Sequence, residues 1–479
     1  MTFENQAKFV LLVVLDGWGL SAPGPGNAIS LANTVNMNRF WATYPHGELS
    51  ASGEAVGLPR GETGNTETGH LNLGAGRIVY QDLVRINMSI AEGTFFTNPA
   101  LVGAIEHAKK NNSGLHLMGL MGAGGVHSNI EHLLALIQLA RKMSFTNVYL
   151  HLFTDGRDSP PTSSKIYLKK VRDVVEKEQV GQIASIMGRY WAMDRDLRWD
   201  RTAKAYACLT RGEGHLVKTP EEAIDISYAQ GVTDEFIEPA LMTDSAGKPI
   251  SLIKDNDAVI FFNFRVDRPR QLSRAFVIDD FSKAGDRLDF DPYLVKYTKK
   301  HVTDQLKTTS SPFDRGKRLQ NLFFVIMTKY DQSLIDSGAK VAFPPEMVEV
   351  PLGKVISEAG LRQLRVAESE KERFVTFYFD GQKESAFPGE ERIIVPSPKV
   401  MIYDQAPAMS AMQITDNLLD KMKSDNDIKF VLINFANPDM IGHTGNIGAT
   451  VKACEVVDEC IGKIANFVLA YGGVMLITA

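Results

Sequence analysis

The chain has 479 residues, a formal net charge of −5, 44% hydrophobic residues and 23% charged residues. This composition indicates a globular protein of two or more domains, and its charge does not favour nucleic-acid binding. The three cysteines, Cys208, Cys454 and Cys460, form no metal-ligand pattern and suit a reducing cytosol. The apolar run at residues 9–15 is too short for a membrane span and has no basic leader, so we expect a cytoplasmic protein.

The first predicted element is a buried parallel strand at residues 10–15, which ends abruptly at Asp16-Gly17-Trp18-Gly19. Sheets of α/β proteins bind their ligands at the carboxyl ends of the strands. Asp16 is therefore a candidate metal ligand, although an Asp before Gly is also a common turn residue.

A glycine-rich turn follows at Gly64-Asn65-Thr66-Glu67-Thr68-Gly69-His70. Glycines allow unusual backbone conformations, so the turn can present the Thr66 hydroxyl at a loop tip. Such a hydroxyl is a weak nucleophile unless a base or a metal lowers its pKa. Thr66 is a candidate nucleophile, with a helix cap before Glu67 as the alternative.

Helical and strand-like patterns then alternate along the chain. Helices are predicted at 129–143 and 447–469 from one buried apolar stripe. Apolar runs predict strands at 148–153, 258–262, 322–327, 430–435 and 474–477. This alternation predicts parallel α/β sheets, and residues 283–317 are the most linker-like segment, read as a solvated surface excursion.

The strand at 430–435 leads into a loop that contains Asn437-Pro438-Asp439-Met440-Ile441-Gly442-His443-Thr444-Gly445. Asp439 and His443 are four residues apart. A carboxylate and an imidazole at short spacing suit Mn²⁺ or Zn²⁺. The alternative is a simple hydrogen-bonded pair.

In combination, residues 16–19, 64–77 and 437–445 closely resemble the cofactor-independent phosphoglycerate mutases of the alkaline phosphatase superfamily. The resemblance covers essentially the whole chain. Further matching motifs, in family order, are Gly125-Val126-His127-Ser128, Asp155-Gly156-Arg157-Asp158, Gly188-Arg189-Tyr190, Ala192-Met193-Asp194-Arg195-Asp196, Phe262-Asn263-Phe264-Arg265 and Val395-Pro396-Ser397-Pro398-Lys399-Val400.

The resemblance implies an α/β protein in which an alkaline-phosphatase-like parallel-sheet domain is discontinuous, with residues 1–80 and 319–479. A second α/β domain, residues 81–312, would be inserted and would bind substrate, closing over the site to exclude water. The implied activity is the interconversion of 3-phosphoglycerate and 2-phosphoglycerate in glycolysis and gluconeogenesis, through a phosphoenzyme and without 2,3-bisphosphoglycerate. Two divalent metal ions are implied, Mn²⁺ first, with Zn²⁺ or Co²⁺ as alternatives.

Arginine suits a phosphoglycerate because its planar fork binds carboxylate and phosphate bidentately. The alternative is that the arginines pair with neighbouring acids such as Asp155, Asp158, Asp194, Asp196 and Asp267. The resemblance implies that the substrate is bound by His127, Arg157, Asp158, Arg189, Arg195, Arg265, Arg268 and Lys371.

The resemblance also gives the catalytic and metal-binding sets. Thr66 is the expected nucleophile. Asp158 is the candidate for moving the hydroxyl proton of glycerate, with His127 second. Metal ligands are expected at Asp16 and Thr66 for one ion and at Asp439 and His443 for the other. The substrate is the one partner implied; no nucleic acid or membrane is expected, and the absence of heptads suggests a monomer.

Three departures from the family pattern matter. Thr66 stands where Ser is usual, and Asn129 and Phe374 stand where His is common. The sequence ends at Ala479, where the family continues with Asp-His-Gly-Asn. We therefore expect a C-terminally incomplete chain with weak metal sites. A catalytically silent phosphoglycerate-binding fragment is the alternative function; a phosphatase or phosphopentomutase is disfavoured by the full run of arginine motifs.

Overall fold

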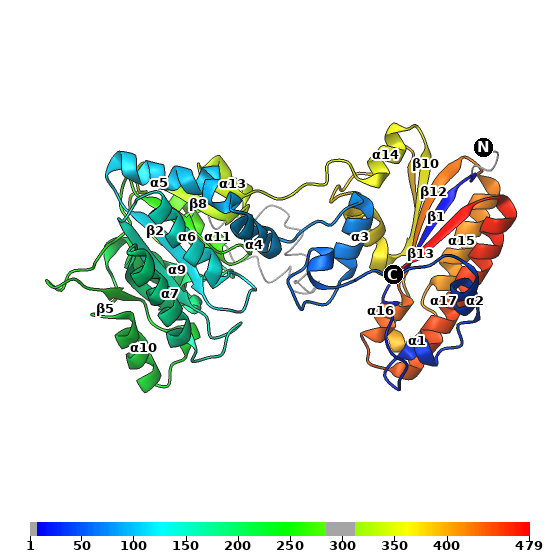
Figure 1. Cartoon of the computed structure of the whole chain (residues 1–479), viewed down its shortest axis with the longest axis horizontal. Coiled ribbons are helices and arrows are strands. Elements are labelled where there is room, and N and C mark those ends of the chain that lie inside the picture. The colour runs from blue at the N-terminus through cyan, green and yellow to red at the C-terminus, as the bar shows by residue number, and fades with distance from the viewer. Residues whose placement is uncertain (1–6, 284–311) are drawn as a thin grey trace. The chain divides into compact units, whose positions relative to one another are not determined.

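The computed structural model describes residues 7–283 and 312–479, so most of the linker-like segment at 283–317 lies outside the described residues. The chain divides into two compact units (Figure 1). The first unit comprises residues up to Gln81 and from Glu346 to Ala479, and the second comprises Asp82–Pro345. Each unit is an α/β layer structure around its own sheet.

The first unit contains a five-stranded sheet in the order β11-β10-β12-β1-β13, with every neighbouring pair parallel. The strands are β1 (Val10–Leu15), β10 (Arg362–Glu368), β11 (Glu390–Val395), β12 (Ile428–Phe435) and β13 (Val474–Thr478). The helical elements are α1 (Ala28–Leu31), α2 (Val35–Thr43), η1 (Gly53–Val56), α3 (Thr66–Ala75), α14 (Leu352–Glu358), η6 (Ser369–Lys371), η7 (Phe374–Tyr378), η8 (Tyr403–Gln405), α15 (Ala411–Ser424), α16 (Asn437–Gly442) and α17 (Ile447–Tyr471).

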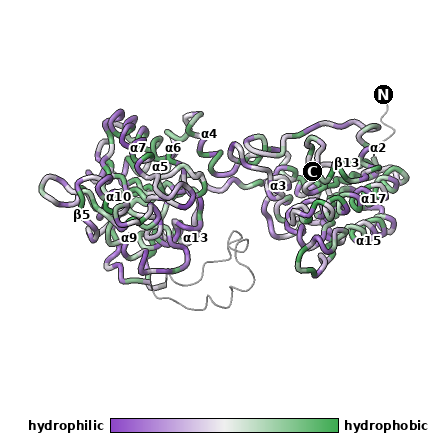
Figure 2. Tube along the Cα trace, turned by 90° about the horizontal axis from the view of Figure 1, so that it is seen from below, coloured by the Kyte–Doolittle hydropathy of each residue, from purple (hydrophilic) through white to green (hydrophobic). Residues whose placement is uncertain are grey.

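Both faces of this sheet are covered, as is usual for a parallel sheet. On one face, α15 and α17 pack their apolar stripes against Leu11, Val13 and Leu15 of β1. On the other face, α14, η7 and α3 pack against Val14 and Leu432. The central strand β1 is accordingly a continuous apolar run, whereas β10 and β11 include charged residues. Figure 2 colours the trace by hydropathy and shows hydrophobic and hydrophilic residues alternating along it.

The second unit contains an eight-stranded sheet in the order β5-β6-β4-β3-β2-β7-β8-β9, parallel except between β4 and β6. The strands are β2 (Leu115–Met121), β3 (Val148–Thr154), β4 (Gln182–Gly188), β5 (His215–Val217), β6 (Ala240–Met242), β7 (Ala258–Phe261), β8 (Phe323–Thr328) and β9 (Lys340–Phe343). The helical elements are α4 (Asp82–Glu92), η2 (Thr94–Thr97), α5 (Pro99–Asn111), α6 (Ile130–Lys142), α7 (Ser164–Glu178), α8 (Arg189–Ala192), α9 (Trp199–Arg211), α10 (Pro220–Ala229), η3 (Asp234–Phe236), α11 (Pro269–Val277), η4 (Phe281–Lys283) and α13 (Gln332–Asp336).

Two hydrophobic cores lie on opposite faces of the second sheet. One includes apolar residues of α5, α6, α7 and α10. The other includes apolar residues of α9 and α11. The α/β class and the parallel sheets agree with the alternation of elements in the sequence.

The boundary near residues 312–319 differs from the expectation. The residues of β8 and β9 fall within the segment 319–479 that was expected in the phosphatase-like domain. In the structure, β8 pairs with β7 and β9 pairs with β8. The hydrogen-bonded ladder therefore keeps residues 323–343 in the second unit, and the division falls between Pro345 and Glu346.

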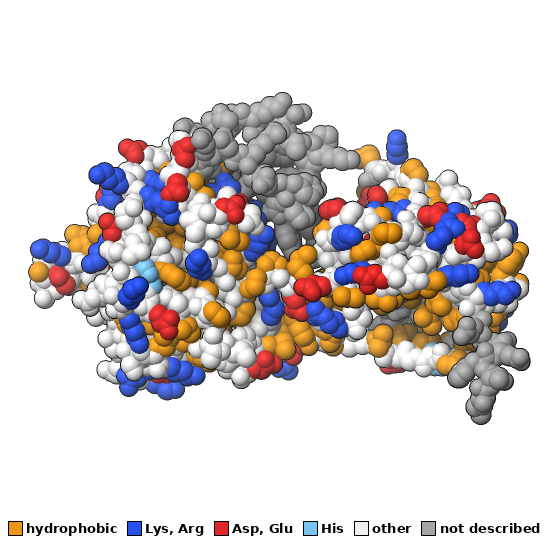
Figure 3. Space-filling view, turned by 90° about the horizontal axis from the view of Figure 1, so that it is seen from above, with side chains coloured by type: hydrophobic (Ala, Val, Ile, Leu, Met, Phe, Trp, Pro, Cys, Tyr) orange, Lys and Arg blue, Asp and Glu red, His pale blue; other side chains and the backbone are white. Residues whose placement is uncertain are grey.

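The surface has a mixed charge. On the face drawn in Figure 3, acidic and basic side chains lie interspersed over both units, as on an ordinary soluble domain. Within residues 7–283 and 312–479, every helix is too short or too polar to span a lipid bilayer.

Close packing of α3 on η7 gives a first testable prediction. A Cβ atom at Gly74 would lie 1.9 Å from the carbonyl oxygen of Phe379, whereas one at Gly69 in the same helix would meet nothing within 4 Å. We expect Gly74→Ala to destabilise the first unit by roughly 1–3 kcal/mol through overpacking. The matched variant Gly69→Ala should be neutral or stabilising by up to about 1 kcal/mol through helix propensity. Calorimetric unfolding measures both, and equal stability of the two variants would contradict this packing.

Candidate active site

Asp16 and Thr66 meet at the carboxyl end of β1. Asp16 follows the last residue of this strand, and the Thr66 hydroxyl donates a hydrogen bond to Asp16 Oδ1 at 3.0 Å. Thr66 is the first residue of α3, and Asn65 caps this helix by accepting a hydrogen bond from the Thr68 N–H at 2.9 Å. The glycine-rich segment is therefore a helix start rather than a loop tip, and the capping residue is Asn65 rather than Thr66.

The start of α3 has an electrostatic consequence for Thr66. The first turn of a helix leaves N–H groups free and carries partial positive charge, so negative charge is stabilised there. A phosphoryl group on the Thr66 oxygen would lie at the amino end of a ten-residue helix.

Lys371 is buried beside these residues, with only 3% of its surface exposed. Its ammonium group lies 2.8 Å from Asp16 Oδ2, 3.2 Å from Thr66 Oγ and 2.5 Å from Asp439 Oδ2. By its local sequence alone this lysine would be an ordinary surface residue. The structure buries it because η6 follows directly from β10, whose carboxyl end lies next to that of β12.

Asp439 and His443 lie on α16 and at its carboxyl end, not in a loop as predicted. Pro438 favours the first turn of a helix, and helical spacing brings residues i and i+4 together. His443 Nε2 is 3.3 Å from Asp439 Oδ1, and the imidazole is 76% exposed. The two side chains are therefore close together, as both the metal-site prediction and the alternative of a hydrogen-bonded pair require.

Gly17 allows Asp16 and Asp439 to approach each other. Its φ is +82°, and a Cβ atom there would lie 2.7 Å from the backbone N and Cα of Asp439. A side chain at this position would force the start of α16 away from β1.

The donor chemistry of this cluster fits a divalent cation. Carboxylate oxygens, a hydroxyl and an imidazole are ligands of Mn²⁺ and Zn²⁺, and here Asp16, Thr66 and Asp439 already surround the Lys371 ammonium. In the described part of the chain, no three or more His, Cys, Asp or Glu side chains are grouped so as to hold a metal ion. The predicted ligand pairs, Asp16 with Thr66 and Asp439 with His443, therefore stay a prediction.

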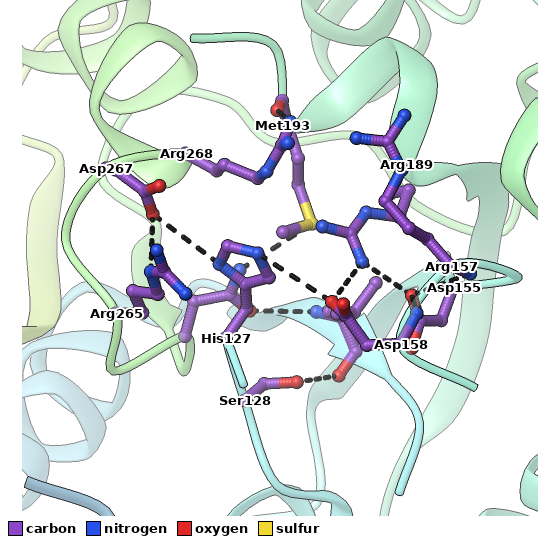
Figure 4. A network of polar contacts seen from close by, with 12 residues as sticks. His127, Ser128, Asp155, Arg157, Asp158, Arg189, Met193, Arg265, Asp267 and Arg268 are labelled. Carbon is purple, nitrogen blue, oxygen red and sulfur yellow. Dashed lines mark hydrogen bonds and ion pairs between the residues drawn. The ribbon is translucent and has the colours of Figure 1, made fainter. Parts of the chain in front are cut away.

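A second cluster lies in the second unit, at the carboxyl ends of four adjacent strands (Figure 4). His127 follows β2, Asp155 and Asp158 follow β3, Arg189 follows β4, and Arg265 follows β7. The sheet order β4-β3-β2-β7 brings these distant segments to one edge, where parallel sheets bind ligands.

Arg189 anchors this cluster. Its guanidinium is buried and donates to Asp155 Oδ1 at 2.6 Å and to Asp158 Oδ2. The two carboxylates are held in place because Asp155 also accepts the backbone N–H groups of Arg157 and Asp158.

His127 lies between two carboxylates. Its Nε2 is 3.7 Å from Asp158 Oδ2, and its Nδ1 is 3.5 Å from Asp267 Oδ1. Burial holds the pKa of His127 well below its usual range, and the charges of Arg189, Arg265 and Arg268 lower it further against the opposing effect of Asp267. The imidazole is therefore neutral and only weakly basic at physiological pH.

The remaining arginines surround this histidine. Arg195 and Arg265 contact Asp267 at 2.6 and 3.3 Å, Arg157 pairs with Glu235, and Arg268 donates to the carbonyl of Met193 at 3.1 Å. Neighbouring acids thus pair with several of them, as the alternative interpretation held. The pKa of Arg268 is lowered to about 10 by burial and by the charges of Arg189 and Arg195, which indicates a concentration of positive charge suited to an anion.

Two residues at the family's usual histidine positions have other contacts. Asn129 caps α6 by accepting from the Glu131 N–H. Phe374 lies with its ring centre 5.8 Å from that of His70 and 4.9 Å from the Lys371 ammonium. Asp267 was expected only as a possible partner of the arginines, and Glu235, His70 and Asn434 had no role predicted from the sequence. An Asn within the apolar run at 430–435 was the one available signal for Asn434.

Comparison with known proteins identifies the family. Residues 86–332 match the family model described as BPG-independent PGAM N-terminus. The 2,3-bisphosphoglycerate-independent phosphoglycerate mutase of Moorella thermoacetica is 48% identical over 473 residues, 98% of this chain and 85% of that protein. The mutase of the same name from Chloroflexus aggregans is 48% identical over 480 residues, 99% of this chain and 86% of that protein.

A solved structure agrees with these relatives. The crystal structure of Leishmania mexicana phosphoglycerate mutase at low cobalt concentration is 29% identical, with a TM-score of 0.51, covering 99% of this chain and 82% of that chain. The fold is therefore that of this mutase, and the chain belongs to the 2,3-bisphosphoglycerate-independent phosphoglycerate mutase family.

Proposed function

We propose that this chain interconverts 3-phosphoglycerate and 2-phosphoglycerate by transferring the phosphoryl group to Thr66 and back to glycerate. Family membership supports a mutase and not the alternative of a silent phosphoglycerate-binding protein. The observation that carries the chemistry is the Thr66 hydroxyl, 3.0 Å from Asp16 Oδ1 and 3.2 Å from the Lys371 ammonium.

In the first half-reaction, Thr66 Oγ attacks phosphorus and the bond from phosphorus to the glycerate oxygen breaks. Asp16 Oδ1 accepts a hydrogen bond from the Thr66 hydroxyl and is the group placed to take its proton as the new bond forms, while the departing glycerate oxygen gains a proton through Asp158. The Lys371 ammonium and the amino end of α3 stabilise negative charge on the phosphoryl oxygens. Two divalent cations, one held by Asp16 and Thr66 and the other by Asp439 and His443, would supply further charge stabilisation and a lower hydroxyl pKa.

In the second half-reaction, the other hydroxyl of glycerate attacks the phosphoryl group on Thr66. The arginines of the second unit would hold the glycerate carboxylate through this exchange, since a bidentate guanidinium stays charged and fixes orientation. Asp158 moves the hydroxyl proton in this proposal. His127, whose Nε2 lies 3.7 Å from Asp158 Oδ2, is the second candidate.

The proposal has further parts that follow from the family and the sequence. The chain would use two divalent ions, Mn²⁺ first and Zn²⁺ or Co²⁺ as alternatives, and no 2,3-bisphosphoglycerate. It would act as a monomer in the cytoplasm, in glycolysis and gluconeogenesis.

The nucleophile is tested by substitution. We expect Thr66→Ala to lower kcat by roughly a thousandfold or more, because no other group can take its covalent role. Thr66→Ser keeps the hydroxyl and should retain turnover. An enolase-coupled assay measures both rates. Wild-type turnover by Thr66→Ala would contradict this role of Thr66.

The arginine cluster is tested at Arg195, which is partly exposed and pairs with Asp267 at 2.6 Å. Arg195→Met should lower kcat/KM about 10–100-fold, the cost of about 1.5–3 kcal/mol for a lost hydrogen bond to a charged group. Arg198→Met is the matched control, because Arg198 is exposed and lies 3.8 Å from Asp196. Equal kcat/KM for the two variants would exclude Arg195 from substrate binding.

Metal dependence is tested by removal. Dialysis against a chelator should abolish turnover, and Mn²⁺ should restore it, because the hydroxyl pKa depends on a bound cation. The mutase reaction is run without added metal and then quenched. The 2-phosphoglycerate formed is measured afterwards with enolase, which is supplied with the metal that it needs. Full turnover by chelator-treated protein would contradict a metal-assisted mechanism.

A further inference from the structure

Four groups of the first unit form a closed ring of hydrogen bonds around the candidate nucleophile. His70 Nδ1 lies 2.9 Å from the carbonyl oxygen of Thr66. Asn434 Nδ2 lies 3.1 Å from His70 Nε2 and 3.1 Å from Asp16 Oδ2. The ring closes through the hydrogen bond from the Thr66 hydroxyl to Asp16 Oδ1.

The direction of each hydrogen bond follows from the chemistry of its partners. A carbonyl oxygen only accepts, so His70 Nδ1 carries the hydrogen and Nε2 must accept. The two hydrogens of the Asn434 amide then go to His70 Nε2 and Asp16 Oδ2. The opposite amide orientation would place an oxygen against a carboxylate and leave both acceptors without a donor.

The ring is shielded from water. Asn434 is 0% exposed, His70 2% and Asp16 6%. These three side chains therefore make their hydrogen bonds to one another with little competition from bulk water. Asn434 joins segments far apart in sequence because β12 pairs with β1 in register, Asn434 opposite Val14.

Asn434 is not the most stable choice at its position. Its Oδ1 is buried and has no hydrogen-bond partner among the residues that the structure describes. An unpaired buried acceptor destabilises the folded state, so an apolar side chain of similar shape would suit a purely structural role at least as well. An apolar side chain would lack the two amide hydrogens that Asn434 directs at His70 and Asp16.

We infer that His70 and Asn434 are positioning residues for phosphoryl transfer at Thr66. Asn434 holds Asp16 Oδ2, which leaves Oδ1 directed at the Thr66 hydroxyl, and His70 fixes the backbone of Thr66 at the start of α3. The inference rests on the proposed function of Thr66 and adds the groups that set its geometry.

Substitution of Asn434 tests the inference most sharply. Asn434→Leu removes both donors and the unpaired acceptor together. We expect kcat to fall about 10–100-fold, the usual effect of losing a group that orients a functional side chain. KM should change by less than about twofold, because the proposed substrate arginines lie in the second unit. The thermal unfolding temperature should be no lower than that of the control Thr415→Val, which deletes a buried hydrogen bond to Ala411 O in the same unit.

Substitution of His70 provides an independent arm. His70→Ala should show the same loss of kcat at unchanged KM. His70→Gln can still accept the Asn434 hydrogen, so it should recover part of the rate. Thr415→Val should keep the wild-type kcat.

The outcomes separate the inference from the function on which it rests. Loss of kcat at constant KM in Asn434→Leu or His70→Ala, with partial recovery in His70→Gln, supports the positioning role. A kcat within twofold of wild type, or a KM that rises as kcat falls, overturns it. Thr66→Ala, measured in parallel, tests the function itself. If Thr66→Ala is inactive while Asn434→Leu and His70→Ala are fully active, the positioning role alone is refuted. If Thr66→Ala turns over at the wild-type rate, the proposed function is refuted.

Discussion

The hydrogen bond from the Thr66 hydroxyl to Asp16 is the contact on which the proposed chemistry depends. Thr66 makes this bond from the start of α3, and the sheet order β10-β12-β1 brings three strand ends together around it. Lys371 follows β10, Asp439 follows β12 and Asp16 follows β1. Two carboxylates and one ammonium thus meet in a buried space, where each charge offsets the desolvation of the others.

The second unit applies the same constraint to the groups proposed to hold the substrate. Parallel pairing of β4, β3, β2 and β7 gathers Arg189, Asp158, His127 and Arg265 at one edge. Acidic partners fix the guanidinium groups, and the pKa of Arg268 is lowered by burial and by the charges of Arg189 and Arg195. His127, which is neutral at physiological pH, lies at the same edge. The proposed function therefore assigns phosphoryl transfer to the first unit and most of the substrate recognition to the second.

Much of this arrangement could be predicted from the sequence, because apolar runs that end in Asp or Arg identify strand ends. The strands at 148–154 and 428–435 and the helix at 447–471 fall within two residues of their predicted bounds. What failed depended on tertiary contacts. The burial of Lys371 follows from sheet order, and the boundary at Pro345 follows from pairing of β8 with β7. Asn434 resembles a core strand residue in sequence, and its two partners, Asp16 and His70, lie hundreds of residues away.

The most direct test of the account is phosphopeptide mapping of protein quenched during turnover of 3-phosphoglycerate in the presence of Mn²⁺. The account predicts that the covalent phosphate is found on the peptide containing residues 64–77, at Thr66. Phosphate on another residue, or active protein that never carries covalent phosphate, would contradict it.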